Sequence, residues 1–122
     1  MKIWFDGGCR PNPGVIETAV FTGGVVYHRA DRGQGDNNDA EWLALLDALA
    51  VARDLGAGDV VLLGDSAMVV DQVRGRARRI PVRFGGYLAQ FRVLAAGFDR
   101  VRVRHVARSH NLAGIALSQN GA

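Results

Sequence analysis

Three acidic residues stand where the sequence predicts that their side chains meet. Asp6 follows an apolar alternation over residues 1–5, Glu41 opens a long amphipathic stretch, and Asp65 follows an apolar run at 60–63. If the strands that end at Asp6 and Asp65 are parallel neighbours, both carboxylates emerge at the edge where open α/β sheets bind ligands. Glu41, in the first turn of a helix, can point to the same place.

Clustered carboxylates repel one another, so such a group persists comfortably only if a cation neutralises it. Oxygen ligands favour magnesium or manganese over zinc, and two such ions, roughly 3.5–4 Å apart, can clamp the attacking and leaving oxygens of a phosphodiester. Taken singly, each acid also has a structural explanation. Asp6 could be a turn residue, Asp65 a helix cap, and Glu41 a charge that favours the helix dipole.

Hydrophobic periodicity predicts the elements that would position these acids. Strands are expected at residues 1–5, 15–21, 25–29, 60–63 and 101–106, and helices at 40–55, from a cap at Asp65 or Ser66 to 73, at 87–96 and at 111–119. Loops are expected at 9–14, 30–38 and 75–83, and Asp6-Gly7-Gly8 is expected to be a turn. An antiparallel meander followed by alternating helices and strands predicts a single α/β domain over 1–122, with a mixed sheet and helices on its faces.

Composition indicates a globular protein of one domain. The chain has 122 residues, 48% of them hydrophobic, and a net charge of +3 carried almost wholly by arginine, since Lys2 is the only lysine. Arginine suits bidentate phosphate contacts. Cys9 is the only cysteine, which indicates a reducing compartment. The apolar run from Val15 to Tyr27 is too short and too polar to span a bilayer, so a soluble cytoplasmic protein is expected.

The residues around the three acids form motifs that resemble type 1 ribonuclease H. They are Asp6 to Gly14 (DGGCRPNPG), Asn37 to Glu41 (NNDAE), Asp65-Ser66 after an apolar strand, and Arg108 to Asn111 (RSHN) after the last strand. Four motifs in order over nearly the whole chain are far more specific than a lone Asp-Gly-Gly. The resemblance implies a ribonuclease H-like fold, in which a five-stranded mixed sheet has flanking helices.

The same resemblance implies a function and roles for individual residues. The family hydrolyses the RNA strand of RNA–DNA hybrids endonucleolytically with two Mg²⁺ or Mn²⁺ ions, leaving 5′-phosphate and 3′-hydroxyl ends. Asp6 would bridge both ions, while Glu41 and Asp65 would complete the ion nearer the leaving group. Glu41 would also sense the RNA 2′-hydroxyl. Contacts to the minor groove of the hybrid would come from Cys9, Asn12, Asn37 and Asn38.

These last four residues have simpler explanations as well. Asparagine is common in turns, and Cys9 could be a small, partly buried side chain. His110 lies where the family has a mobile histidine that assists product release, although a loop histidine is usually only solvated. We keep His110 as a candidate proton carrier.

The family pattern is broken at one ligand position. The fourth carboxylate of the family stands four residues after the asparagine that opens the last helix, and this position is Ile115 here. Asn111 could replace it with its amide oxygen, water could fill the place, or catalysis could be lost; Asn111 also suits a helix N-cap. We favour a contribution of Asn111 to the metal site. We also expect an enzyme that needs more metal or prefers manganese.

A basic stretch without acids follows the Asp65 motif. It contains Arg74, Arg76, Arg78, Arg79 and Arg83 and is expected to be a surface loop between two helices. Such a run is usually a solvated face, but at this place in the family a basic element often grips the duplex. Contacts to several phosphates would make binding steeply salt-dependent. Ala67 replaces the glutamine usual after the Asp-Ser pair, so one substrate contact is expected to be missing.

Three functions remain open from the sequence. The first is the ribonuclease H activity, acting on an RNA–DNA hybrid as a monomer without an obligate protein partner. The second is a non-catalytic hybrid-binding module, which Ile115 favours and the retained acids oppose. The third is a related nuclease that acts on structured DNA.

Overall fold

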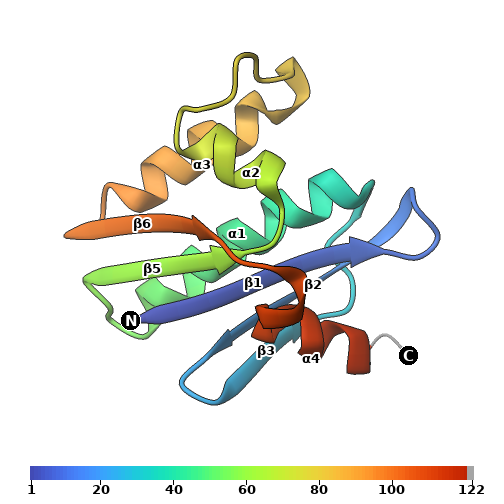
Figure 1. The fold of residues 1–122 in the computed structure, drawn as a ribbon, viewed down its shortest axis with the longest axis horizontal. Helices are drawn as coiled ribbons and strands as arrows, with labels where there is room; N and C mark the ends of the chain where they lie inside the picture. Colours follow the sequence, from blue (N-terminus) through green and yellow to red (C-terminus); the bar gives the residue numbers. More distant parts are fainter. Residues whose placement is uncertain (121–122) are drawn as a thin grey trace.

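A mixed β-sheet with strand order β3-β2-β1-β5-β6 forms the centre of the computed structural model, which describes residues 1–120 (Figure 1). Strands β1 (Lys2–Cys9), β2 (Gly14–Thr22) and β3 (Val25–Arg29) form an antiparallel meander. Strand β5 (Asp59–Gly64) is parallel to β1, and β6 (Arg100–His105) is parallel to β5. The five predicted strands are therefore confirmed, and a two-residue strand, β4 (Gln34–Gly35), pairs with β2.

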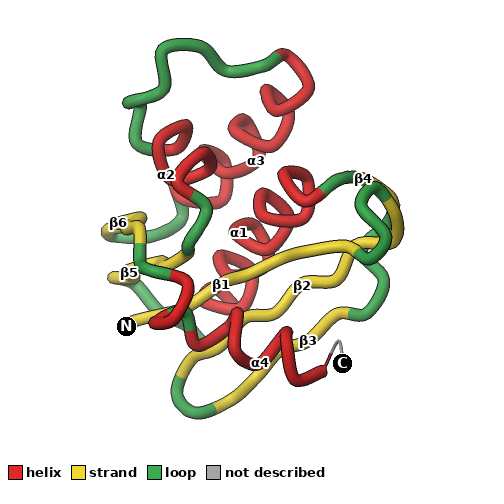
Figure 2. Tube along the Cα trace, turned by 45° about the vertical axis from the view of Figure 1, so that its right-hand side comes forward, coloured by secondary structure: helices red, strands yellow, loops and turns green. Residues whose placement is uncertain are grey.

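Four α-helices flank the sheet. Helices α1 (Asn37–Asp54), α2 (Ala67–Val73) and α3 (Gly85–Ala95) pack together on one face, whereas α4 (Leu112–Asn120) packs on β1 and β2 from the other (Figure 2). Two short 3₁₀ turns, Val82–Phe84 and Arg108–His110, precede α3 and α4. No helix in residues 1–120 has both the length and the apolar character needed to cross a membrane.

The core lies between the sheet and helix α1. Ile3 and Phe5 of β1 and Leu62 of β5 pack with Leu45 and Leu49 of α1, and all five side chains are fully buried. Each such side chain contributes about 1.5–3 kcal/mol by leaving water. This packing fixes α1 against the central strands, and thereby fixes where Glu41 projects.

The predicted turn at Asp6-Gly7-Gly8 is wrong, because β1 continues through both glycines to Cys9. Gly7 pairs with Thr18 of β2. A Cβ atom at Gly7 would lie 2.1 Å from the carbonyl oxygen of Ala40 in α1, so this glycine permits a close helix–strand approach rather than a turn. Asp6 consequently lies inside a strand instead of at its end.

Helix α1 begins three residues earlier than predicted, so Asn37 and Asn38 lie in its first turn and Glu41 lies in the second. The Asp36 side chain accepts hydrogen bonds from the backbone N–H groups of Asn38 and Asp39, and the Asp39 side chain accepts one from the backbone N–H of Asp36. This reciprocal capping box satisfies N–H groups that the first turn leaves unpaired.

The other helix boundaries differ little from the predicted ones. Ser66, and not Asp65, caps α2, because its hydroxyl accepts from the backbone N–H of Val69 at 3.3 Å. The Asp65 carboxylate is thus left free of a capping role. Helix α3 begins at Gly85, two residues before the predicted start at Tyr87.

Candidate active site

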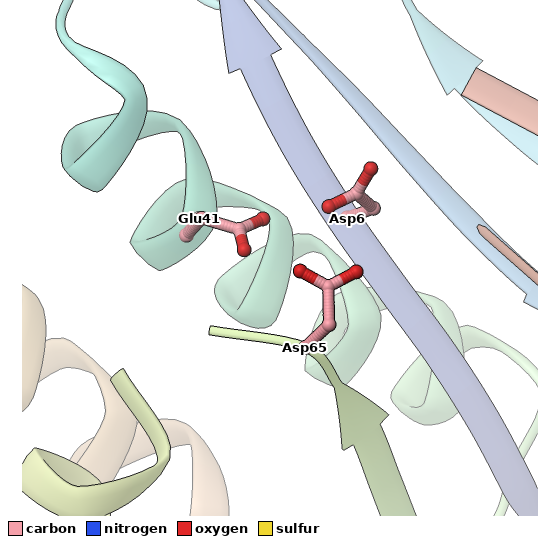
Figure 3. Close-up of side chains that lie close together, drawn as sticks. All are labelled: Asp6, Glu41 and Asp65. Atoms are coloured by element: carbon pink, nitrogen blue, oxygen red, sulfur yellow. The ribbon is translucent and has the colours of Figure 1, made fainter. Parts of the chain in front are cut away.

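The side chains of Asp6, Glu41 and Asp65 converge beside the interior of β1 and the carboxyl end of β5 (Figure 3). The parallel register pairs Trp4 with Leu63, which places Asp6 beside Asp65 two residues further along. Glu41 reaches the same point from α1. One carboxylate oxygen from each residue lies within 4.8 Å of the other two, so the predicted convergence is confirmed.

Burial and mutual repulsion disfavour the ionised forms of two of these carboxyl groups. Burial, and next the charge of Asp65, raise the pKa of Asp6 to about 6 against the opposing hydrogen bond with Glu41. Burial and the nearby Asp6 charge raise the pKa of Glu41 well above its usual value. No ion pair within residues 1–120 involves any of these acids. Carboxylate oxygens without a neutralising partner are suited to a hard divalent cation.

Two hydrogen bonds orient the acids. The backbone N–H of Gly7 donates to Oε1 of Glu41 at 2.7 Å, so the close approach of α1 to β1 brings this carboxylate to the strand. The side-chain amide of Asn111 donates to Oδ2 of Asp65 at 3.0 Å. Figure 3 shows the three side chains directed toward one another, from β1, from α1 and from the end of β5.

The predicted metal-ligand role of Asn111 requires correction. Asn111 is fully buried, and its Nδ2 also donates to the carbonyl oxygen of Phe5 at 3.0 Å. Its Oδ1 accepts from the backbone N–H groups of Ala113 and Gly114. Exchanging the two amide atoms would break all of these bonds. The amide oxygen caps α4 and is turned away from the acids, so Asn111 acts on the cluster as a donor to Asp65.

The break in the family pattern lies at the rim of the site. Ile115 is 44% exposed and lines the same groove as the acids. Its neighbour Gly114 lies so close to Asp6 that a Cβ atom there would be 3.3 Å from Oδ2 of the acid. The last helix therefore contacts the cluster, but its side chain at the fourth position is apolar.

The three acids lie in a groove of about 880 Å³. Of the predicted substrate-binding residues, Cys9, Asn37 and Asn38 line it. Asn12 lies beside them, where its Oδ1 accepts from the backbone N–H of Asn37 at 3.2 Å. The side chain of Asn37 in turn accepts from the backbone N–H of Cys9 at 3.1 Å. Cys9, Asn12 and Asn37 therefore form one hydrogen-bonded wall, in which Cys9 itself is buried.

Sequence reasoning missed Arg108 as an individual site residue. Arg108 lines the groove, and its positive charge lowers the pKa of Asp6. His110, two residues later, is exposed and is absent from the groove lining, so its catalytic role remains a prediction. The Arg-Ser-His-Asn motif contained the signal, but a spacing pattern does not tell which of its side chains points inward.

The basic stretch forms the connection between α2 and α3, at the top of Figure 1. Arg74, Arg78 and Arg79 are exposed. Arg76 is exposed as well and forms an ion pair, with its Nη2 3.5 Å from Oδ1 of Asp71. Arg83 is different, because it bonds to Asp36 at 2.9 Å and to Asp39 at 3.2 Å. These ion pairs give Arg83 a structural role, and its phosphate contact stays a prediction.

Comparisons with known proteins agree with this geometry. Residues 18–121 match the family model described as reverse transcriptase-like. Ribonuclease HI of Halobacterium salinarum is 35% identical over 120 residues, which are 94% of this chain and 60% of that protein. The chain therefore spans about 60% of the length of this curated relative.

Two solved structures are similar over almost their full lengths. RNase H1 from H. salinarum has a TM-score of 0.84 and 30% identity, over 99% of this chain and 98% of that one. The N-terminal RNase H domain of a bifunctional protein from Mycobacterium tuberculosis has a TM-score of 0.79 and 31% identity, over 99% and 97% of the two chains.

Proposed function

The chain belongs to the type 1 ribonuclease H family, and from this membership we propose that it hydrolyses the RNA strand of RNA–DNA hybrids endonucleolytically, leaving 5′-phosphate and 3′-hydroxyl ends. The observation that carries the proposal is the convergence of Asp6, Glu41 and Asp65 within 4.8 Å. A module that only binds hybrids gains nothing from three mutually repelling carboxylates.

The acids are suited to hold two Mg²⁺ or Mn²⁺ ions, with Asp6 shared between them and Glu41 and Asp65 on the ion nearer the leaving group. When bound, such ions activate the attacking water and stabilise the charge that develops on the phosphate. Asn111 holds the Asp65 carboxylate in orientation. Ile115 offers no ligand, so water would have to take this place when the ion is bound. The weaker ion site should raise the metal requirement or favour manganese.

Substrate recognition falls to the groove wall. Asn12, Asn37, Asn38 and Cys9 contact the minor groove of the hybrid, and Glu41 senses the 2′-hydroxyl that distinguishes RNA from DNA. Arg108 offers a guanidinium to the phosphate nearest the acids.

The connection between α2 and α3 makes sequence-independent contacts to the duplex backbone through Arg74, Arg76, Arg78 and Arg79. We further propose that residues 1–122 act as a single domain, as a monomer in the cytoplasm without an obligate protein partner.

Ile115 favours one other function, a hybrid-binding module that has lost catalysis. A decisive assay incubates end-labelled RNA–DNA hybrid with the protein in magnesium, in manganese or in chelator, beside matched duplex RNA and structured duplex DNA. Metal-dependent cutting of only the hybrid's RNA is the expected result. Binding without cutting in any metal would establish the binding module, and cutting of structured DNA would establish a different nuclease. Asp65→Asn should nearly abolish cutting. Its matched control is Asp99→Asn, which changes an exposed acid outside the groove lining.

A further inference from the structure

The sheet face that carries Asp6 and Asp65 continues over β5 and β6. Along β1, Ile3 and Phe5 point into the core, so Lys2, Trp4 and Asp6 point to the opposite face. Along β6, Val101 and Val103 pack on the same core. The three arginines that alternate with them therefore also point to the face of Asp6; they are Arg100, Arg102 and Arg104.

The strand register arranges these residues in rows across the sheet. Lys2 of β1 is aligned with Val61 of β5 and Arg102 of β6, and Trp4 is aligned with Leu63 and Arg104. With neighbouring strands about 4.8 Å apart, Trp4 and Arg104 are separated by roughly 10 Å. We call the surface formed by Lys2, Trp4, Arg100, Arg102 and Arg104 the arginine face.

Among the helices that the structure describes in residues 1–120, none covers the β5–β6 part of this face. Helix α4 packs on β1, β2 and β3, and Figure 1 shows β5 and β6 without a helix in front of them. Lys2, Arg100 and Arg104 are exposed. Within residues 1–120 the arginine face makes one ion pair, in which Nη2 of Arg102 lies 3.0 Å from Oδ1 of Asp59. Four cationic side chains thus face one paired carboxylate.

The arginine face leads directly into the acidic groove. The backbone N–H of Val106, just beyond β6, donates to the carbonyl oxygen of Gly64 at 2.9 Å. The ring of His105 lies 3.2 Å from the carbonyl oxygen of Asp65. Arg108 then lines the groove itself. Arginines therefore lead from the start of β6 to the acids: Arg100, Arg102 and Arg104 lie along the strand, and Arg108 lies in the groove beyond its end.

A simpler explanation is that the arginines of this edge strand serve solely to prevent its pairing with other chains. That purpose is served by charges on either face of β6. It does not explain why all three arginines share the face of the acids, nor why Lys2 of the interior strand β1 lies in their row.

We propose that the arginine face binds a single strand of nucleic acid that extends from the groove, with its phosphates on the arginines and a base against Trp4. A row of cations beside a half-buried aromatic ring is the arrangement that single strands bind without sequence preference. The identity of this strand, as the unpaired flank of a hybrid, rests on the proposed function; the binding itself does not.

The test measures the anisotropy of a fluorescein-labelled oligothymidylate in chelator, where no metal-dependent cleavage can occur. The double variant Arg100→Gln/Arg104→Gln should bind about tenfold more weakly at low salt than the wild type. Its plot of log affinity against log salt should be shallower by about 1.4, since each single-strand phosphate contact contributes about 0.7. Binding should also change the tryptophan fluorescence of the wild type, because Trp4 is partly exposed whereas Trp42 is buried.

Two further variants keep the test decisive. Arg53→Gln/Arg92→Gln removes two exposed arginines from α1 and α3 and should bind like the wild type. Lys2→Gln, which leaves the edge strand intact, should reduce the slope by about 0.7.

Unchanged affinity and slope in the β6 double variant would overturn the proposal, as would an equal loss in the α1/α3 control. Self-association of the β6 variant with undiminished binding would also overturn it, by showing that the arginines only protect an edge. Failure of hybrid cleavage would leave this measurement unaffected.

Discussion

Two acidic clusters lie near the start of α1, one at its N-cap and one beside its second turn. They differ in the hydrogen bonds and countercharges that the protein supplies to them. Asp36 and Asp39 accept hydrogen bonds from backbone N–H groups, from the Arg83 guanidinium and from the Tyr87 hydroxyl. The backbone hydrogen bond at Asp39 and then the Arg83 interaction lower the pKa of Asp36.

Within residues 1–120 the other cluster, Asp6 with Glu41 and Asp65, makes no ion pair, and Gly7 and Asn111 donate hydrogen bonds to Glu41 and Asp65. Burial raises the pKa of two of its three carboxyls. The same residue types therefore stabilise the fold where the chain supplies the countercharge, and create a demand for an external cation where it does not.

The largest expected difference between the clusters is in catalysis. Asp65→Asn should lower hybrid cleavage by about 10³-fold, because several kcal/mol of metal-derived stabilisation of the transition state is lost. Asp36→Asn should change it little, since asparagine caps a helix as well as aspartate. Single-turnover cleavage assays compare the two. Equal losses would mean that the acids near Asp65 serve structure alone.

The two clusters should also respond to pH with opposite sign. The pKa of Asp6 is raised to about 6 from 3.8, so its contribution is fully present below about 4 and is lost as pH rises through 6. In chelator, the free energy of unfolding should fall by up to about 3 kcal/mol over this window. Asp36, whose pKa is lowered, contributes above its unfolded pKa and loses this contribution on further acidification.

Urea unfolding at pH 4.5 and 7 in chelator measures this effect. Asp6→Asn should remove the decline, and a divalent ion should reverse it in the wild type at pH 7. A wild type and an Asp6→Asn variant with the same pH dependence would contradict the raised pKa.

The donor from Asn111 should matter for metal binding. Asn111→Ser keeps an oxygen that can cap α4 but removes the hydrogen bond to Asp65. It should weaken metal affinity by about 10–100-fold, as is typical when an outer hydrogen bond to a ligand is lost. Calorimetric titration with manganese would measure the loss. Unchanged affinity with reduced stability would restrict Asn111 to its capping role.

Supplying the missing carboxylate should strengthen metal binding, whereas loss of the Asn111 hydrogen bond should weaken it. Ile115→Asp adds an acid at the rim of the groove and should lower the metal concentration for half-maximal cleavage by about tenfold, because ligand charge tunes divalent-ion affinity. Ser118→Asp adds the same charge elsewhere on α4 and controls for simple attraction of cations. Equal effects of the two variants would exclude a coordination place at Ile115.

The smallest expected effect concerns the cluster of Asp36 and Asp39, for which the protein supplies its own countercharge. Asp36→Ala should reduce the free energy of unfolding by about 1 kcal/mol through loss of the cap. Asp36→Ser should recover most of this, and Asp54→Ala, at an exposed site near the end of α1, should cost little. Chemical denaturation measures all three. No loss in Asp36→Ala would show that Arg83 and Asp39 hold the helix start by themselves.

The sequence alone predicted the features that depend on local pattern. Alternation and apolar runs located all five main strands, and the order of elements gave the mixed sheet. The acids Asp6, Glu41 and Asp65 were candidates because each ends or begins a predicted element, and the surrounding motifs that resemble ribonuclease H selected them. The predicted loop at 30–38 hid the start of α1, since a capping box made of two aspartates resembles an ordinary polar loop.

The features that sequence could not predict depend on contacts between distant segments. Arg83 stands in a basic run, but its partners Asp36 and Asp39 lie over 40 positions earlier. The orientation of the Asn111 amide depends on Phe5, 106 positions away. Gly7 looked like a turn residue because no local pattern reports that a helix passes against it.

Gly7 links the packing of the fold to the geometry of the acidic cluster. Its missing side chain lets the Ala40 carbonyl come within 2.1 Å of where a Cβ atom would stand, and Glu41 follows in sequence. The place of the Glu41 carboxylate relative to Asp6 and Asp65 is therefore set by how closely two pieces of main chain approach, at a residue that contributes no ligand.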